Sequence, residues 1–200
     1  QAPVDSNREA ALAGEPQAQF QMGLAYDLGR VVDQDYVAAL EWYGKAALAG
    51  HADAQNSVGS LLQAGLGAPQ NDELAVAWYR KASLQGHAEA TNNLAYMFDL
   101  GRGVEEDNRE AARIYQRGCE LGSAKAMLNL GIMLGRGEPG LPANPVEAYK
   151  WLELGRRATE TSNDAQIKAN LRGALNQLTK ELTPEQLTEG RRQADGRRGW

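Results

Sequence analysis

The chain has 200 residues, a formal net charge of −5 at pH 7 and a single cysteine. A nucleic-acid interface requires a clustered basic surface, which this charge balance argues against, and one cysteine excludes a framework of intramolecular disulfides. No apolar run approaches the roughly 18 residues of a membrane-spanning helix, so we expect no direct insertion into a membrane.

A period of 36 residues is the strongest pattern in the sequence. Alanine recurs at this step from Ala18 to Ala126, and glycine recurs in several columns, one of which holds Gly29, Gly65, Gly101 and Gly137. A fixed period between 20 and 50 residues indicates stacked structural repeats. We therefore predict four repeats, at residues 15–50, 51–86, 87–122 and 123–159, the last with one additional residue near 139–142.

The segment before the first repeat, residues 1–14, is predicted to be an arm followed by a half-repeat cap. Ser6 and Glu9 fit a capping box, and the short helix after it should end at Gly14, which lies 36 residues before Gly50. The chain starts with Gln1 rather than methionine, as a mature exported protein does after removal of its leader. We thus expect a periplasmic or secreted protein rather than a cytoplasmic one, although a trimmed expression product would start in the same way.

Each repeat is predicted to be a hairpin of two helices. The first helix, such as Gln17–Leu28, should end at the Gly29 column, because glycine adopts the left-handed conformation that ends a helix. The second helix should begin at an N-cap residue, whose side chain accepts hydrogen bonds from the first turn. The predicted N-caps are Asp35, Asn71, Asp107 and Asn144.

Apolar residues at three- and four-residue spacing mark one face of each predicted helix. Small residues in the Gly23 and Ala46 columns should let paired helices approach closely, while Trp42 and Tyr43 fill the space between repeats. A single hairpin cannot bury this face alone, so the repeats must stack on one another.

Residues 160–200 break the period and should seal its last apolar face. Asn163–Leu182 carries an apolar stripe typical of a capping helix, and Thr183 with Pro184 predicts the start of another helix. The tail Arg191–Trp200 is basic and ends in an aromatic residue. We interpret it as a frayed soluble end, with binding of anionic lipid or of a phosphate-rich partner as the alternative.

Four segments carry a family resemblance: Ala77–Ala82 (AWYRKA), Gly86–Ala90 (GHAEA), Leu94–Phe98 (LAYMF) and Gly101–Val104 (GRGV). With these segments the chain resembles the Sel1-like repeat family, which is related to tetratricopeptide repeats. The resemblance implies an all-α fold, a right-handed α/α solenoid of four hairpins between an N-terminal half-repeat and C-terminal capping helices. The chain departs from the family pattern at Val31, where a turn glycine is usual, at Ile114 in a tryptophan column, and in the Pro-Gly-rich insertion.

Other motifs have structural explanations. Gly135–Gly140 matches G-x-G-x-x-G, but a helix rather than a strand precedes it, so no dinucleotide site is predicted. His51 and His87 occupy one repeat column, which favours packing or hydrogen bonding at a helix start over a metal site. Cys119 falls in a small-residue column and is predicted to be buried. The carboxylates Asp99, Glu105, Glu106 and Asp107 are typical of a solvated turn. We therefore predict no catalytic residue, no metal and no cofactor.

One stripe of each first helix varies between repeats while the packing columns do not. Stacked repeats use their concave surface for binding, and we expect this stripe to face it and to contact a peptide or helix with charge and an apolar anchor. Its residues are Gln17, Phe20, Leu24 and Asp27; Asp53, Asn56, Ser60 and Gln63; Glu89, Asn92, Tyr96 and Asp99; and Lys125, Leu128, Ile132 and Arg136.

The family resemblance implies a non-enzymatic adaptor or regulator, and we predict a monomer that binds a protein or peptide partner on this stripe. Some members of the family serve as immunity partners of secreted toxins, which gives a second hypothesis. A structural scaffold in a membrane complex and a hydrolase acting on cell-wall fragments are further alternatives, the last without any residue constellation behind it.

Overall fold

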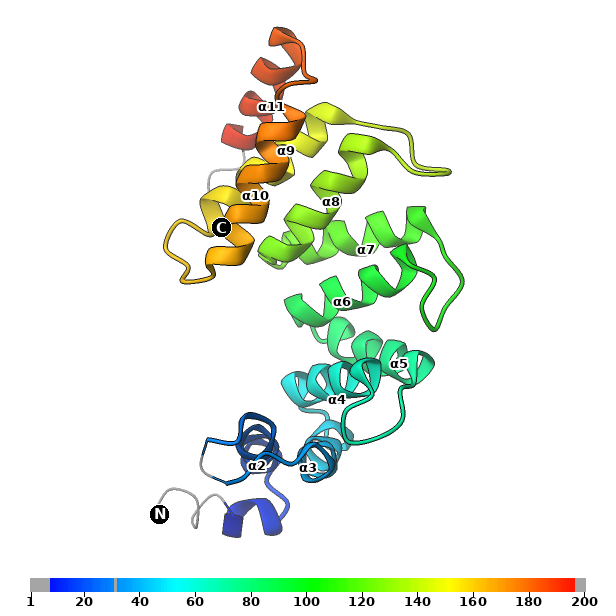
Figure 1. Ribbon diagram of the computed structural model, residues 1–200, viewed down its shortest axis with the longest axis vertical. Helices are drawn as coiled ribbons and strands as arrows, with labels where there is room; N and C mark the ends of the chain where they lie inside the picture. Colours follow the sequence, from blue (N-terminus) through cyan, green and yellow to red (C-terminus); the bar gives the residue numbers. More distant parts are fainter. Residues whose placement is uncertain (1–7, 31, 197–200) are drawn as a thin grey trace. The chain divides into compact units, whose positions relative to one another are not determined.

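The computed structural model describes residues 8–30 and 32–196, and within these ranges the fold is all-α (Figure 1). Residues 8–12 are helical, and a regular series of helices follows. The predicted arm, the Ser6 end of the first capping box, Val31 and the last four residues of the tail lie outside the described residues. The helices are α2 (Pro16–Leu28), α3 (Tyr36–Leu48), α4 (Ala52–Ala64), α5 (Asp72–Leu84), α6 (Ala88–Asp99), α7 (Asn108–Glu120), α8 (Ala124–Arg136), α9 (Pro145–Ala158), α10 (Ala165–Leu178) and α11 (Pro184–Gly196).

The chain divides into two compact units. Unit 1 consists of Gln1–Ala90 together with Gly101–Glu105, and unit 2 consists of Thr91–Leu100 together with Glu106–Trp200. The first two predicted repeats thus belong to unit 1 and the fourth to unit 2, while the division passes through α6 of the third.

The predicted N-caps of the second helices are confirmed. The Oδ1 atom of Asp35 accepts hydrogen bonds from the backbone N–H groups of Val37 and Ala38, at 2.9 and 3.0 Å. Asn71, Asp107 and Asn144 cap α5, α7 and α9 in the same way. These bonds satisfy donors that have no partner inside the helix, which explains why each second helix begins where it does.

The turns between paired helices depend on glycine. Gly29 ends α2 in the left-handed region at φ +62°, as predicted for its column. Later in the turn, Gly67 and Gly103 also have positive φ values, +75° and +67°, and a Cβ on either would collide with backbone atoms of Tyr36 and Asp72 respectively. In unit 1, therefore, the turn after a first helix lies directly on the start of the preceding second helix, and only glycine fits there.

The core of each unit is a row of large side chains seated against small ones. In unit 1, Tyr43 and Tyr79 are fully buried, and a Cβ at Gly23 or Gly59 would collide with their rings. In unit 2, Tyr115 and Leu152 take the corresponding places, Trp151 beside Leu152 is also fully buried, and Cys119 is buried as predicted. In the Gly23 column the small residue makes room for the tyrosine ring of the paired helix, which occupies the space that a Cβ would need.

The C-terminal capping helix is confirmed with shorter bounds. α10 begins after its N-cap Asp164, and its buried stripe Ile167, Leu171, Leu175 and Leu178 packs against α8 and α9. Leu182, included in the predicted helix, lies beyond its end.

The last helix, α11, corrects the prediction of a frayed tail. Thr183 caps it reciprocally with Gln186, and α11 packs on α9, where a Cβ at Gly190 would meet the ring of Tyr149. Residues 191–196 are therefore part of a packed helix. Across the described residues, every helix is too short or too polar to cross a membrane.

Candidate functional site

The predicted contact residues lie on α2, α4, α6 and α8, and we call them the first-helix stripe. The structure exposes half of them: Gln17, Asp53, Ser60, Glu89, Tyr96, Lys125, Ile132 and Arg136. Six are half-buried: Phe20, Leu24, Asp27, Asn56, Gln63 and Asp99. Asn92 and Leu128 are 6% and 7% exposed, so their predicted place on the surface is corrected.

Asn92 is buried because it takes part in a polar contact inside unit 2. Its side-chain oxygen accepts a hydrogen bond from Nδ2 of Asn129 at 3.0 Å, and its own Nδ2 lies 3.4 Å from Oδ1 of Asn93. A buried amide needs such partners. Leu128 is apolar and packs into the core of the same unit. Asn92 and Leu128 therefore belong to the buried part of unit 2 and not to the surface that the exposed stripe residues form.

The position of Arg136 in the repeat also needs correction. In the third repeat the backbone N–H of Asp107 donates to the carbonyl of Phe98, and in the fourth the N–H of Asn144 donates to the carbonyl of Leu134. Leu134 is therefore equivalent to Phe98, and the residue equivalent to Asp99 is Gly135. Arg136 is one position further on, at the end of α8.

A tyrosine of each second helix contacts the last stripe position in three repeats. The hydroxyl of Tyr43 donates to Asp27 at 3.0 Å, that of Tyr79 to Gln63 at 2.7 Å, and that of Tyr115 to Asp99 at 3.3 Å. Burial raises the pKa of each tyrosine, so the hydroxyls remain donors. These three stripe residues consequently hold their hairpins together and offer only part of their surface to a partner.

Asp99 in addition has an altered pKa. Burial raises the pKa of its carboxyl group, and the hydrogen bond from Tyr115 and the charge of Arg136 act in the opposite direction. This stripe position in unit 2 is therefore a partly desolvated carboxylate rather than an ordinary solvated one.

The fourth repeat lacks the tyrosine pair. Leu152 stands at the tyrosine position, since a Cβ at Gly131 would lie 2.5 Å from its Cγ, and Gly135 stands at the acceptor position. A pocket of about 170 Å³ opens here between α8, α9 and α10. We call it the fourth-repeat pocket; it is lined by Gly131, Ile132, Gly135, Arg136, Leu152, Ala174, Gln177, Leu178 and Glu181.

The two histidines lie at helix starts, which confirms their structural interpretation. Nδ1 of His51 accepts from the N–H of Ala54 at 3.3 Å, which places the ring proton on Nε2, 2.9 Å from Oε1 of Gln17. Phe20 stacks on this imidazole with ring centroids 4.8 Å apart. The stripe residues Gln17 and Phe20 are thus fixed by the start of α4.

His87 repeats this arrangement one period later. Its Nδ1 accepts from the N–H of Ala90 at 3.0 Å, and its Nε2 lies 3.1 Å from Oδ1 of Asp53. Among the described residues, no group of three or more histidine, cysteine or acidic side chains is placed to hold a metal ion.

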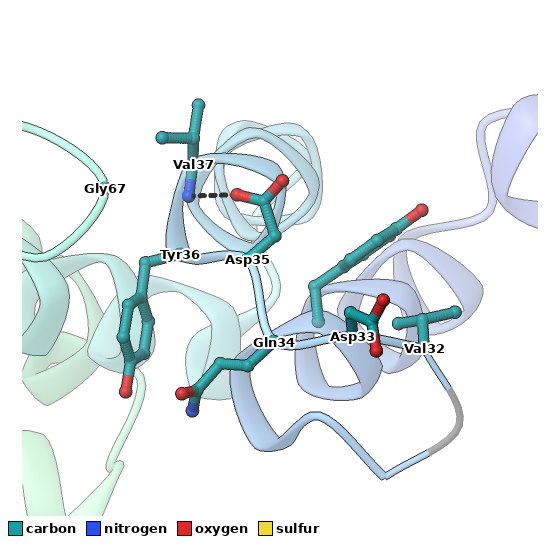
Figure 2. Close-up of a pocket in the computed structure, with 8 residues that line it drawn as sticks. Val32, Asp33, Gln34, Asp35, Tyr36, Val37 and Gly67 are labelled. Carbon is teal, nitrogen blue, oxygen red and sulfur yellow. Dashed lines mark hydrogen bonds between the residues drawn. The ribbon is translucent and has the colours of Figure 1, made fainter.

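Unit 1 contains an open depression at the turn between α2 and α3. Figure 2 shows its lining, with the Asp35 carboxylate turned back onto the N–H of Val37 and the backbone of Gly67 near Tyr36. Asp33 and Asp35 both line it, but Asp35 is engaged as the N-cap of α3. We assign the depression to the turn packing rather than to a ligand.

Comparison with known proteins agrees with this repeat geometry. A family model described as Sel1 repeat matches residues 16–51, 52–87, 88–123 and 124–158. The chain belongs to the Sel1 repeat family. Proteins of this family are typically non-enzymatic scaffolds for protein interaction. A comparison with curated proteins found no match.

Solved structures share the Sel1 repeat fold. A Sel1 repeat protein from Oxalobacter formigenes is 30% identical with a TM-score of 0.77, over 96% of this chain and 77% of that one. A protective antigen of uropathogenic Escherichia coli strains, with an SLR fold, is 25% identical with a TM-score of 0.52, over 96% of this chain and 47% of that one. An immunity protein from Pseudomonas aeruginosa is 18% identical with a TM-score of 0.52, over 88% and 73%, which shows the fold alone.

The sequence predicted two residues of the fourth-repeat pocket in this Sel1 repeat protein and missed the others. Ile132 and Arg136 were predicted, and the structure brings them together with Leu152, Leu178 and Glu181 in the fourth-repeat pocket. The replacement of tyrosine by Leu152 was visible as a break in a repeat column. The contribution of α10 was not, because it depends on how a helix outside the period packs.

Proposed function

We propose that this Sel1 repeat protein is a non-enzymatic interaction module that binds a protein or peptide on the unit 2 part of the first-helix stripe. The family's typical role supports binding. The placement is carried by one observation in unit 2. Tyr96 and Ile132, at equivalent positions of consecutive repeats, are 40% and 41% exposed, and Ile132 borders an apolar pocket. Aromatic and aliphatic side chains beside a pocket are typical anchors of binding surfaces.

A competing surface exists in unit 1 and serves as the control. Leu48 and Leu84, at the ends of α3 and α5, are 78% and 70% exposed and also occupy equivalent repeat positions. They are more exposed than Tyr96 and Ile132 but line none of the described pockets. Exposed leucines are common on protein surfaces and these line none of the described pockets, so we place the partner on the stripe.

The test compares two matched double variants of the full chain. The stripe variant is Tyr96→Ser with Ile132→Ser, and the control variant is Leu48→Ser with Leu84→Ser. A partner is captured from the native source with the unaltered chain, purified, and titrated against each variant by calorimetry. We expect the stripe variant to weaken binding at least about tenfold, as loss of interface anchors does, and the control to bind as the unaltered chain does.

The reverse pattern would move the partner to the leucines of unit 1 and overturn the placement. Circular dichroism of each variant should show unchanged helicity, since all four side chains are exposed. Asn92, which the sequence placed on the stripe, is unsuitable as a target because its replacement would leave Asn129 without this hydrogen-bond acceptor.

The identity of the captured protein also decides between an adaptor and an immunity protein. The likeness to an immunity protein at 18% identity concerns the fold, and no described residue favours that role over another. If the captured partner is a toxin, co-expression should protect cells from it, and the stripe variant should lose that protection.

A further inference from the structure

The fourth-repeat pocket has the size and lining of a site for one apolar side chain. Its walls are formed by Ile132 of α8, Leu152 of α9, and Ala174 and Leu178 of α10. Its volume of about 170 Å³ is below the roughly 300–1,000 Å³ of sites that enclose small-molecule ligands and cofactors. A leucine, methionine or phenylalanine side chain fits this space.

The pocket arises from a specific exchange in the repeat. Elsewhere the equivalent position is filled by a tyrosine ring whose hydroxyl is bound by a polar side chain of the first helix. Leu152 is shorter than tyrosine, and Gly135 offers no side chain; a Cβ there would lie 3.5 Å from Cδ1 of Leu178. The space that a tyrosine and its acceptor would occupy is therefore left open and apolar.

The rim of the pocket has an excess of negative charge. Arg136 is already paired with Glu138, while the exposed Glu181 accepts a hydrogen bond from the neutral amide of Gln177, at 2.9 Å, which leaves its charge uncompensated by that contact. In addition, α8 ends at Arg136 and α10 ends at Leu178. Helix C-termini carry partial negative charge and favour cations.

We propose that the fourth-repeat pocket receives one large apolar side chain from a basic segment of a partner protein, with a neighbouring lysine or arginine held by Glu181. The inference rests on the proposed function, because it specifies what binds at the Ile132 end of the stripe. The apolar floor selects the anchor, and the acidic rim selects the charge beside it. This division of roles is usual where an apolar pocket gives affinity and polar groups give specificity.

The direct test uses short capped peptides and methyl NMR of the full chain. The probes are the amides N-acetyl-Leu-Lys, N-acetyl-Leu-Glu and N-acetyl-Ser-Lys, at millimolar concentration. We expect N-acetyl-Leu-Lys to shift the methyl signals of Ile132, Leu152 and Leu178. N-acetyl-Leu-Glu should bind at least about threefold more weakly because of the acidic rim, and N-acetyl-Ser-Lys should cause no shift. Equal shifts with the serine and leucine peptides would overturn the proposal.

Two variants separate the anchor from the charge. Ala174→Leu fills the pocket and should abolish the shifts, whereas Ala169→Leu, at an exposed position of α10 outside the pocket lining, should leave them unchanged. Glu181→Lys, on the exposed rim, should reverse the preference between the lysine and glutamate peptides. Persistence of the shifts in Ala174→Leu, or an unchanged preference in Glu181→Lys, contradicts the proposal.

Failure of this inference is distinguishable from failure of the proposed function. If a captured partner binds Ala174→Leu with unchanged affinity but loses affinity for the stripe variant, the stripe binds a partner and the pocket does not. If the peptides bind as expected but the stripe variant retains its partner, the pocket inference about peptide chemistry stands and the stripe placement fails.

Discussion

One equivalent position is filled in opposite ways in two regions of the molecule, the first two repeats of unit 1 and the fourth repeat of unit 2. In unit 1 the hydroxyls of Tyr43 and Tyr79 are bound by Asp27 and Gln63. In the fourth repeat Leu152 and Gly135 stand at those positions, and a pocket opens. Each repeat still forms a hairpin of two helices, so this exchange of side chains changes the surface without changing the fold. A stacked repeat can thus acquire an open pocket where a single hydrogen-bonded pair is replaced.

The turns of the two regions differ as well. In unit 1 the turn glycines Gly67 and Gly103 lie against the backbone of the preceding second helix. In the fourth repeat the inserted turn contacts that helix through side chains: Nε of Arg109 donates to the carbonyl of Gly140 at 2.6 Å. Backbone contact tolerates no added atom, whereas a side chain can move aside.

The largest expected effect tests this difference in the turns. Gly103→Ala should destabilise unit 1 by about 3 kcal/mol, because it adds a Cβ against the backbone of Asp72 and places alanine at positive φ. Gly140→Ala is the matched control. Its φ is also positive, at +76°, but the nearest atom is the flexible Nε of Arg109 at 3.4 Å.

We expect Gly140→Ala to cost about 1 kcal/mol, the backbone penalty alone. Urea unfolding followed by circular dichroism measures both changes. Equal losses for the two variants would show that the turns do not differ in the way that the geometry indicates.

An intermediate effect tests the tyrosine exchange by rebuilding it. Leu152→Tyr should destabilise unit 2 by about 2 kcal/mol, because it buries a hydroxyl where Gly135 provides no acceptor. Adding Gly135→Asp supplies the acceptor found in the third repeat as Asp99. The double variant should recover about 1 kcal/mol relative to the sum of the two single changes.

The same double variant should close the fourth-repeat pocket. A favourable coupling energy in the double-mutant cycle, with loss of the leucine-peptide shifts, is the expected combination. Additive free energies would mean that the introduced tyrosine and aspartate do not meet, and that the fourth hairpin differs from the others in more than these two side chains.

Most of the fold could be predicted because it is encoded locally and repeated. The N-caps Asp35 and Asn71, the Gly29 turn and the small-residue columns each depend on residues within one hairpin, and four copies reinforce one another. The bounds of α10 were predicted less accurately, since no second copy of it exists. Leu182 continued the apolar stripe in sequence, but the helix ends before it.

The stripe could be predicted only in part, because exposure depends on partners that sequence position does not reveal. Asn92 is polar yet buried, since Asn129, 37 residues further on, provides its hydrogen-bond donor. Arg136 was placed one position out of register, and Gly135 at the true position was therefore overlooked. The pocket itself requires α10 as a wall, and its packing is a tertiary contact.

The smallest expected effect compares two carboxylates of unit 2 across pH. Arg156 and Arg157 hold the pKa of Glu153 below its usual range, while burial raises the pKa of Asp99. A lowered pKa stabilises the fold above the unfolded-state value and loses that contribution as pH falls through the folded value. A raised pKa acts in the opposite sense: its stabilising contribution to the fold is present at acid pH and is lost as the pH rises through the folded-state value.

Glu153→Gln should therefore destabilise unit 2 by about 1 kcal/mol at pH 7, with the difference shrinking as the pH falls towards 3. Asp99→Asn keeps an oxygen acceptor for Tyr115 and removes a partly desolvated charge, which Glu106 and Glu138 further disfavour and Arg136 partly offsets. It should match the unaltered chain at low pH and be slightly more stable at pH 7. Urea unfolding between pH 3 and 8 gives both profiles. If Asp99→Asn is instead destabilising at pH 7, the interactions of the Asp99 carboxylate with Tyr115 and Arg136 stabilise the fold by more than the burial of that carboxylate costs. The third repeat then holds Tyr115 through a charged acceptor rather than a neutral one.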